Sequence, residues 1–329
     1  MNILIVDSHN AEIPKNAFNL HLRNSLILKD LFNRHWDDCC DLVTLPKHLE
    51  PLKGKVYDKV IFIHASAYAK ASHFVKFLLN SPKADYYYIV NDYYLGEPHA
   101  LWALCRDYGY KFTCIANHQP EASKVVTKNV SDWHVVNLNC LIYESLPKRI
   151  NKGGLFFDTP EHQREILYYG AVRSGRVKYF KKYFDQDFIV STSKKNIEKF
   201  EKLGVYACWM PRLNWWGSGN TLYDYRTSLY IEDEATHIHY SQMANRFYEA
   251  LSYGVISIFD RSCLNTIQKS GYNINPALVV KDKEDLKGLL DFLKYIDINQ
   301  AILQDVDENR ELAEQEKKLT LDKIREIVL

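Results

Sequence analysis

The segment Tyr168–Lys178 (YYGAVRSGRVK) combines small residues with closely spaced guanidinium groups, a mixture suited to binding phosphate. Small residues let backbone N–H groups approach a phosphate, and one guanidinium group can bind two of its oxygens. The candidate phosphate ligands are Gly170, Arg173, Ser174 and Arg176. An ordinary strand-to-helix turn with solvated arginines has the same composition, and for the segment alone it is the simpler interpretation.

A second candidate is the pair Arg246 and Glu249 in the segment Asn245–Glu249 (NRFYE). Residues three apart share one face of a helix, here close to its N-terminus. A diphosphate is stabilised by an arginine and by the helix dipole, and a ribose diol by a carboxylate acceptor. For the pair alone, a surface salt bridge worth less than about 1 kcal/mol is the simpler interpretation.

The third candidate is Asp92, which follows a buried run ending at Val90. A carboxylate at the end of a strand can take a proton from an incoming hydroxyl and so act as a general base. A helix N-cap or a turn aspartate explains the position equally well.

The sequence predicts no metal site. His237 and His239 could share one face of a strand, but no third ligand accompanies them. The acidic pairs at 185–187 and 305–307 do not follow strands, and we interpret them as capping and solubility charges.

The elements that must position these residues are short apolar runs separated by amphipathic segments. Predicted strands of the first half are Ile3–Val6, Lys59–Ile63, Tyr86–Val90, Phe112–Ala116 and Val135–Ile142. Helical spacing marks Leu20–Phe32 and Ala71–Leu79. Continuous apolar strands joined by helices predict a parallel sheet covered on both faces.

The second half repeats this pattern. Its predicted strands are Ile166–Tyr169, Phe188–Ser191, Leu229–Ile231 and Val255–Phe259. Its predicted helices are Gln242–Ser252, closed by Gly254, then Glu284–Leu293 and Glu308–Leu329. The pattern predicts two doubly wound α/β domains in tandem with a cleft between them. We expect an N-terminal domain at 1–150, a nucleotide-binding domain at 151–305, and a helix at 306–329 that packs back toward the N-terminal domain.

Length and composition agree with a soluble two-domain protein. The 329 residues exceed the roughly 100–200 typical of one domain, and 47% are hydrophobic. With 42 basic and 41 acidic side chains, any polyanion site must be local.

Seven cysteines without a CxxC pair indicate free thiols in a reducing compartment. Neither a signal peptide nor a stretch of about 20 apolar residues is recognisable, so we expect a cytoplasmic monomer without a membrane partner.

The order of these segments resembles the bacteriophage DNA β-glucosyltransferases that modify 5-hydroxymethylcytosine. The similarity runs through MNILIVD at the start, Tyr57–Ile63, Tyr87–Asp92, Ile166–Gly175, Arg246–Glu249 and Ser257–Asp260. Its most specific part is the Gly-x-x-Arg-Ser-Gly segment followed about 70 residues later by Arg-x-x-Glu.

The resemblance implies a GT-B fold, in which two Rossmann-like domains flank a cleft and the second holds most of a UDP-sugar donor. It implies an inverting glycosyltransferase without an obligatory metal. Carried over by position, Asp92 is the general base, Arg173 and Arg246 bind the donor phosphates, and Glu249 binds the uridine ribose.

Two departures from the family concern the phosphates. Ala171 stands where the family has a serine, and Val177 where it has a second arginine. Either Arg176 or Lys178 can take the place of that arginine.

A third departure concerns the donor sugar. Arg23 or Asn24 stands near the position of a family glutamate that lies close to the sugar, and both are possible donor-sugar contacts. The transferred sugar is therefore glucose or a pentose such as arabinose.

The acceptor that the resemblance implies is double-stranded DNA containing modified cytosine, in a phage-infected bacterial cell. Possible DNA contacts are Lys148, Arg149, Lys152, Lys178, Lys181 and Lys182. Two alternatives stay open. One is a GT-B transferase acting on a glycan, a lipid carrier or a small molecule, and the other is a non-catalytic nucleotide- or DNA-binding protein on the same fold.

Overall fold

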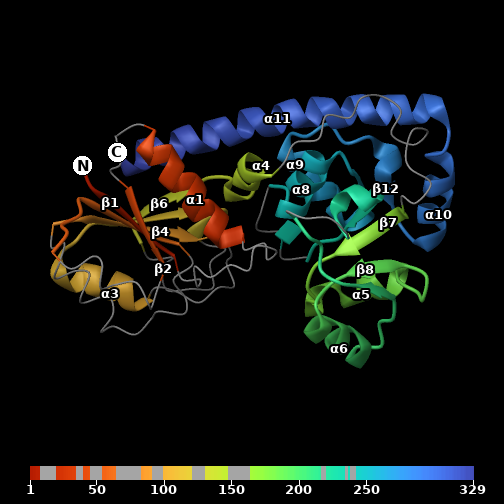
Figure 1. Cartoon of the computed structure of the whole chain (residues 1–329), viewed down its shortest axis with the longest axis horizontal. Helices are drawn as coiled ribbons and strands as arrows, with labels where there is room; N and C mark the ends of the chain where they lie inside the picture. Colours follow the sequence, from red (N-terminus) through yellow and green to blue (C-terminus); the bar gives the residue numbers. More distant parts are fainter. Residues whose placement is uncertain are drawn as a thin grey trace. The chain divides into compact units, whose positions relative to one another are not determined.

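The computed structural model describes residues 1–7, 20–34, 40–44, 54–63, 83–90, 99–120, 130–146, 164–215, 220–233, 236–237 and 242–329. The chain divides into two compact units, each built on its own sheet (Figure 1). The first unit contains the described residues up to Ser145 together with Glu316–Leu329, and the second contains those from Leu146 to Gln315.

The first unit is built on a six-stranded sheet of order β2-β1-β3-β4-β5-β6, in which every neighbouring pair is parallel. Its strands are β1 Ile3–Asp7, β2 Cys40–Thr44, β3 Lys59–Ile63, β4 Asp85–Val90, β5 Phe112–Ala116 and β6 Asp132–Val135. Its described helices are α1 Leu20–Asn33, α3 His99–Tyr108, η5 Leu138–Leu141 and α4 Ile142–Ser145. The predicted parallel sheet is confirmed.

Both faces of this sheet are buried, as the continuous apolar strands require. Along β4, Tyr86 and Tyr88 belong to one hydrophobic cluster and Tyr87 and Ile89 to the other, because successive side chains point to opposite faces. Helix α3 contributes Cys105 to the first cluster. Helix α1 covers the second cluster.

The predicted strand at Val135–Ile142 is wrong beyond its first residue. Strand β6 ends at Val135, and the chain turns into η5 and then α4. The side chain of Asn137 accepts a hydrogen bond from the Asn139 backbone N–H at 3.1 Å and so caps the turn. The apolar residues after it pack as helical turns, with Leu138 and Leu141 in the core.

The second unit has a six-stranded parallel sheet of order β12-β11-β10-β7-β8-β9. Its strands are β7 Arg164–Tyr169, β8 Ile189–Ser191, β9 Cys208–Met210, β10 Tyr225–Tyr230, β11 Ile256–Asp260 and β12 Val279–Val280. The chain runs outward from β7 to β9 and then returns to β10 on the other side of β7. The strand order therefore reverses between β7 and β10, which is where ligands bind in doubly wound sheets.

The helices of the second unit connect these strands. They are η6 Ser174–Arg176, α5 Val177–Tyr183, α6 Lys194–Lys202, η7 Leu222–Asp224, α8 Asn245–Tyr253, η8 Arg261–Cys263, α9 Leu264–Ser270, η9 Pro276–Leu278 and α10 Lys283–Phe292. Gly254 ends α8 in the left-handed conformation, with φ of 67°, as predicted. None of the helices in the described ranges combines the length and the apolar character needed to cross a membrane.

The last helix, α11 (Ile296–Val328), contributes to both units. In the second unit, Asn309 exchanges two hydrogen bonds with the backbone of Asn273, at 2.9 and 2.7 Å, and the Arg310 Nε donates to the Leu251 carbonyl at 2.8 Å. In the first unit, Ile324 and Val328 belong to the hydrophobic core. The helix begins at Ile296, well before the predicted start at Glu308.

Candidate functional site

The turn after β7 places the predicted phosphate ligands at the carboxyl end of the sheet. Gly170 has a φ of 143°, a conformation that favours glycine, and its carbonyl accepts a hydrogen bond from Thr192 Oγ1 at 2.7 Å. Ser174 follows as the first residue of η6, which continues into α5. Arg173 and Ser174 are exposed at the start of this helical segment, where backbone N–H groups have no intrahelical partner.

Arg246, in the first turn of α8, connects the ends of β7 and β10. Its Nη1 donates to the Tyr168 hydroxyl at 2.9 Å and to the Tyr169 carbonyl at 3.3 Å. Its Nη2 donates to the Ile231 carbonyl at 3.1 Å and to Glu232 Oε1. The guanidinium group is thereby fixed at the point where the strand order reverses.

Two further arginines reach the same point from the turn after β7. Arg176 is buried and donates through Nη2 to Glu232 Oε2 and to Asp233 Oδ2, the latter at 3.3 Å. Arg173 donates through Nη1 to Asp233 Oδ2 at 3.4 Å, and 45% of its side chain is exposed. Three guanidinium groups and two carboxylates therefore form one charged cluster with one positive charge in excess.

Glu232, Arg176 and Arg246 keep one another ionised. Burial alone would raise the pKa of Glu232, but the charges of Arg176 and Arg246 outweigh it and hold that pKa below its usual value. Burial likewise opposes the charged form of both arginines, but the Glu232 charge raises their pKa values. These three groups therefore stay charged at neutral pH.

Two glycines of the predicted motif make room for the cluster. A β-carbon on Gly170 would be 3.1 Å from Nη1 of Arg246, and one on Gly175 would be 3.0 Å from Oδ1 of Asp233. Either contact would force the neighbouring charged group to move. The small residues of the segment therefore serve the packing of the arginine cluster.

Glu249 lies one turn along α8 and is buried, with 6% exposure. Since Arg246 pairs with Glu232 and Glu249 is buried, the two residues do not form an exposed surface salt bridge. Burial, and next the Glu249 charge, raise the pKa of Tyr169 well above its ordinary value. The Tyr169 hydroxyl in turn donates to the Arg246 carbonyl at 3.2 Å.

The other predicted site residues that the structure describes lie outside the cluster. Lys178 and Lys181 are exposed on α5, and Lys178 lies over the Tyr179 ring at 5.0 Å. Lys182 pairs with the buried Asp260 at 2.7 Å. In the first unit, Asn24 is buried in α1, with 2% exposure. Outside the described residues lie Asp92, Lys148, Arg149, Lys152 and the side chain of Arg23.

The sequence reasoning missed both carboxylates of the cluster, Glu232 and Asp233, and also Tyr168, whose hydroxyl accepts a hydrogen bond from Arg246. A signal for the two carboxylates was present, since Glu-Asp directly follows the predicted strand Leu229–Ile231. Charged residues at the carboxyl end of a buried parallel strand are candidates for a site in this class of sheet.

Some of the residues considered as metal ligands have other partners, and His239 lies outside the described residues. His237 is buried, its Nδ1 lies 2.7 Å from the Thr266 hydroxyl, and burial lowers its pKa. Asp185 accepts hydrogen bonds from the backbone N–H groups of Asp187 and Phe188 at 3.1 and 3.0 Å, a capping role. Within the described ranges, no three His, Cys, Asp or Glu side chains are arranged to hold a metal ion.

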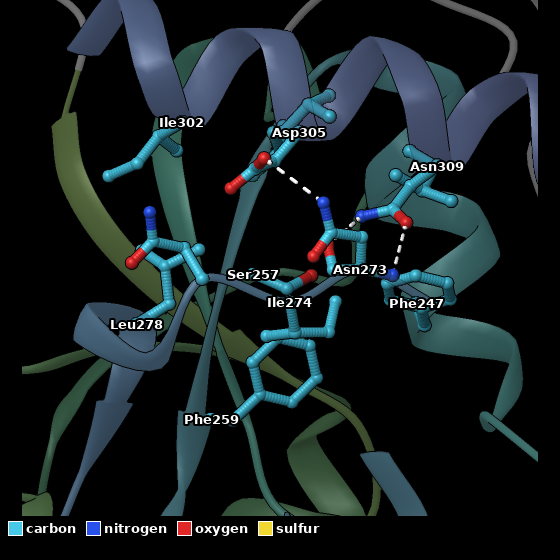
Figure 2. A pocket seen from close by; sticks show the side chains of 13 residues that line it. Phe247, Ser257, Phe259, Asn273, Ile274, Leu278, Ile302, Asp305 and Asn309 are labelled. Atoms are coloured by element: carbon cyan, nitrogen blue, oxygen red, sulfur yellow. Dashed lines mark hydrogen bonds between the residues drawn. The ribbon is translucent and has the colours of Figure 1, made fainter. Parts of the chain in front are cut away.

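A cavity lies apart from the cluster, between β11 and α11 (Figure 2). Asn273 donates to Asp305 at 3.4 Å along its wall, and Ile302 and Phe259 contribute apolar surface. Its volume of about 20 Å³ suffices for about one water molecule. It is therefore too small to hold a nucleotide.

No model of a known protein family matches the sequence, and no curated protein matches it significantly. Solved structures do match. A mutant of the T4 phage β-glucosyltransferase in complex with UDP-glucose is 15% identical, covers 100% of this chain and 99% of that chain, and has a TM-score of 0.69. The fold is GT-B.

Two further structures share the GT-B fold with this chain. An α-glucosyltransferase in complex with UDP-glucose and DNA containing an abasic site has a TM-score of 0.61 at 11% identity, over 100% of this chain and 99% of that one. An α-glucosyltransferase with UDP and a mismatched 13-mer DNA has a TM-score of 0.52 at 10% identity, over 98% and 94%. The arginine cluster thus lies at the strand-order reversal of the second GT-B unit.

Proposed function

We propose that the protein is an inverting glycosyltransferase that moves a sugar from a UDP-sugar to an acceptor hydroxyl. The observation that carries the proposal is the convergence of three arginines at the strand-order reversal of the second unit. The leaving group of a UDP-sugar is UDP, so negative charge grows on its diphosphate in the transition state. Fixed positive charges at that position stabilise it, and such electrostatic stabilisation usually contributes most to catalysis of this kind.

The donor diphosphate lies, in this proposal, against the exposed face of the cluster. Arg173 and Ser174 are exposed at the start of η6, and the Arg173 side chain and the backbone N–H groups there bind the phosphate oxygens in this arrangement. Arg246 contacts the diphosphate from α8, and Arg176 supplies charge from beneath in place of the family's second arginine. Glu249 accepts hydrogen bonds from the uridine ribose, one helical turn from Arg246.

Asp92 is the proposed general base. In the sequence it follows the last residue of β4 by two positions, and it lies outside the described residues. Its carboxylate takes the proton of the acceptor hydroxyl while the hydroxyl oxygen attacks the anomeric carbon. The bond from that carbon to the diphosphate oxygen breaks on the opposite side, so the configuration inverts.

The proposed acceptor is 5-hydroxymethylcytosine in duplex DNA. The ordered resemblance of the sequence supports it, and two of the similar structures were solved with DNA. Lys178 and Lys181 offer exposed positive charge on α5 of the unit that carries the cluster. A base within a duplex must leave the stack before its hydroxyl can meet a buried donor.

The proposed donor sugar is glucose or a pentose such as arabinose. The proposal rests on Arg23 or Asn24, one of which stands near the position of a family glutamate close to the sugar. A change from carboxylate to guanidinium or amide removes an acceptor for sugar hydroxyls and so alters which sugar fits.

A second candidate is a GT-B transferase that glycosylates a glycan or a small molecule. The balanced charge favours it, since 42 basic and 41 acidic side chains create no general attraction to a polyanion. A non-catalytic nucleotide-binding protein would hold UDP through the same cluster but transfer nothing.

One experiment separates the three. The protein is incubated with several UDP-sugars and with duplex DNA containing either cytosine or 5-hydroxymethylcytosine, and the nucleosides are analysed by mass spectrometry. We expect sugar only on the hydroxymethylated DNA, because cytosine lacks the attacking hydroxyl. Binding of DNA should weaken as salt is added, in proportion to the phosphates contacted. Hydrolysis of a UDP-sugar without transfer to DNA would favour the second candidate. Binding of UDP with neither transfer nor donor hydrolysis would favour the third.

A further inference from the structure

The two carboxylates of the cluster hold the arginines in different ways, although Glu232 and Asp233 are neighbours in sequence. Glu232 uses one oxygen for Arg176 and the other for Arg246. Its side chain is 3% exposed. Both of its oxygens therefore have a charged donor, and the carboxylate is fully satisfied.

Asp233 is held much more loosely. One oxygen, Oδ2, accepts from Arg173 at 3.4 Å and from Arg176 at 3.3 Å. Charge-assisted hydrogen bonds in proteins are normally about 2.7–2.9 Å long. The other oxygen, Oδ1, is buried and has no hydrogen-bond partner among the described residues. Leaving a buried carboxylate oxygen unpaired is unfavourable, so the position is not explained by the stability of the folded chain.

Arg173, one of the two arginines that contact Asp233, is also the arginine of the cluster best placed to meet a ligand. Arg173 has 45% of its side chain exposed, compared with 7% for Arg176 and 13% for Arg246. An arginine at the surface of the site can exchange one anionic partner for another with little rearrangement of the protein.

We propose that Asp233 is an internal substitute for the donor diphosphate, which displaces it as the partner of Arg173, whereas Glu232 is a positioning residue that holds Arg176 and Arg246 in place throughout. The inference rests on the proposed function and assigns roles to two residues within that site.

The charges explain why both carboxylates are needed in the empty protein. Three guanidinium groups confined to one point repel one another, and the cluster carries only two compensating charges. When a diphosphate arrives, it brings the charge that Asp233 had supplied, and Asp233 then repels it. Gly175 leaves the space in which Asp233 rests, because a β-carbon there would be 3.0 Å from Oδ1.

The two roles predict opposite effects of two similar substitutions. Asp233→Asn removes the competing charge at constant size, so UDP should bind roughly 3- to 30-fold more tightly, the scale of one close charge interaction in a partly solvated site. Glu232→Gln removes the charge that orients two arginines, so UDP should bind at least roughly tenfold more weakly. Neither substitution should change the affinity for uridine, which lacks phosphates, and a merely structural role would not spare uridine in this way.

The measurement is titration calorimetry of UDP and of uridine with the full-length wild type and both variants. Asp85→Asn, at the amino end of β4, is the matched control for removal of an aspartate charge and should leave UDP affinity unchanged. If Glu232→Gln fails to fold, the tightening in Asp233→Asn still decides the proposal. If the wild type binds UDP and Asp233→Asn binds it with equal or weaker affinity, the inference is overturned but the proposed function is not. Failure of the wild type to bind UDP would overturn the proposed function as well.

Discussion

The guanidinium group of Arg246 occupies the space beside Gly170, so closely that a β-carbon at residue 170 would lie 3.1 Å from Nη1. Any larger residue must displace the arginine or the strand end that holds it. The φ of 143° at Gly170 adds backbone strain for a residue with a side chain. This one contact couples the small-residue turn after β7 to the helix that carries Arg246.

We predict that Gly170→Ala weakens UDP binding at least roughly tenfold, because it moves a phosphate ligand by part of an ångström. Gly271→Ala is the matched control. Gly271 also has a positive φ, of 78°, but a β-carbon there would meet no described atom within 4 Å. Both variants should lose about 1 kcal/mol or more of stability through backbone strain. Calorimetry should find weaker UDP binding only in Gly170→Ala, and equal affinities in the two variants would contradict the prediction.

The arginines should differ in what their removal does to stability. Arg173→Ala and Arg246→Ala should each weaken UDP binding by about 1.5–3 kcal/mol, the value of a charged hydrogen bond. Only Arg246→Ala should also destabilise the fold, by about 3–5 kcal/mol, because it leaves Glu232 buried with one partner fewer. Urea unfolding and calorimetry on the same samples test both parts. Wild-type UDP affinity in both variants would remove the donor site from this position.

Asp92→Asn should lower the rate of transfer by about 10²–10⁴-fold while UDP binding stays nearly intact, since the general base acts on the acceptor and not on the donor. Asp85→Asn is the control, because Asp85 is the first residue of β4, seven positions before Asp92 in the sequence, and pairs with Lys59 at 2.6 Å. Turnover at the wild-type rate in Asp92→Asn would exclude Asp92 from the mechanism.

Stability should fall as the pH drops below about 6.5, because of His237. Burial lowers the pKa of His237 in the folded protein. Below the ordinary histidine pKa, the unfolded chain therefore binds more protons than the folded one, and the free energy of unfolding decreases. The lowered pKa values of Glu232 and Asp260 act only at more acidic pH, below their ordinary values of 4.5 and 3.8. Urea unfolding at pH 7.5 and pH 5.5 should show a smaller loss for His237→Gln than for the wild type, and an equal loss would exclude this residue as the cause.

Transfer should continue to an appreciable extent in EDTA. The positive charge that a bound metal supplies in other transferases is supplied here by the guanidinium groups of Arg173, Arg176 and Arg246. Initial rates with EDTA and with added Mg²⁺ or Mn²⁺ test this. An absolute requirement for either ion would mean that the arginines do not suffice.

Apolar sequence runs predicted the central strands well and the polar or short ones poorly. Strands β3 and β5 have the predicted bounds, Lys59–Ile63 and Phe112–Ala116. Strand β10 starts four residues before the predicted one. The prediction missed this start because Thr227 and Ser228 are polar and interrupt the apolar run, although both are buried in the structure. The Thr227 hydroxyl donates to the Glu165 carbonyl at 2.6 Å, which satisfies it inside the sheet. The short edge strands β9 and β12 give no apolar run long enough to recognise.

The site shows a different limit. Arg173, Arg176 and Arg246 could be recognised because each lies beside a predicted strand or helix end. Their pairing with Glu232 and Asp233 depends on β10 lying next to β7, a neighbour relation between segments about 60 residues apart. Alternation of strands and helices indicates a parallel sheet but leaves the order of its strands open. The choice of partners for the arginines could therefore not be derived from the sequence.

Because the end of helix α11 belongs to the first unit, that unit is begun first during synthesis but completed last. Ile324 and Val328 belong to the core of the first unit, yet the ribosome adds them after the whole of the second. The second unit can thus fold on the emerging chain while the first still lacks part of its core. The N-terminal half, although made first, must wait in an incomplete state until the final turns of α11 are released from the ribosome.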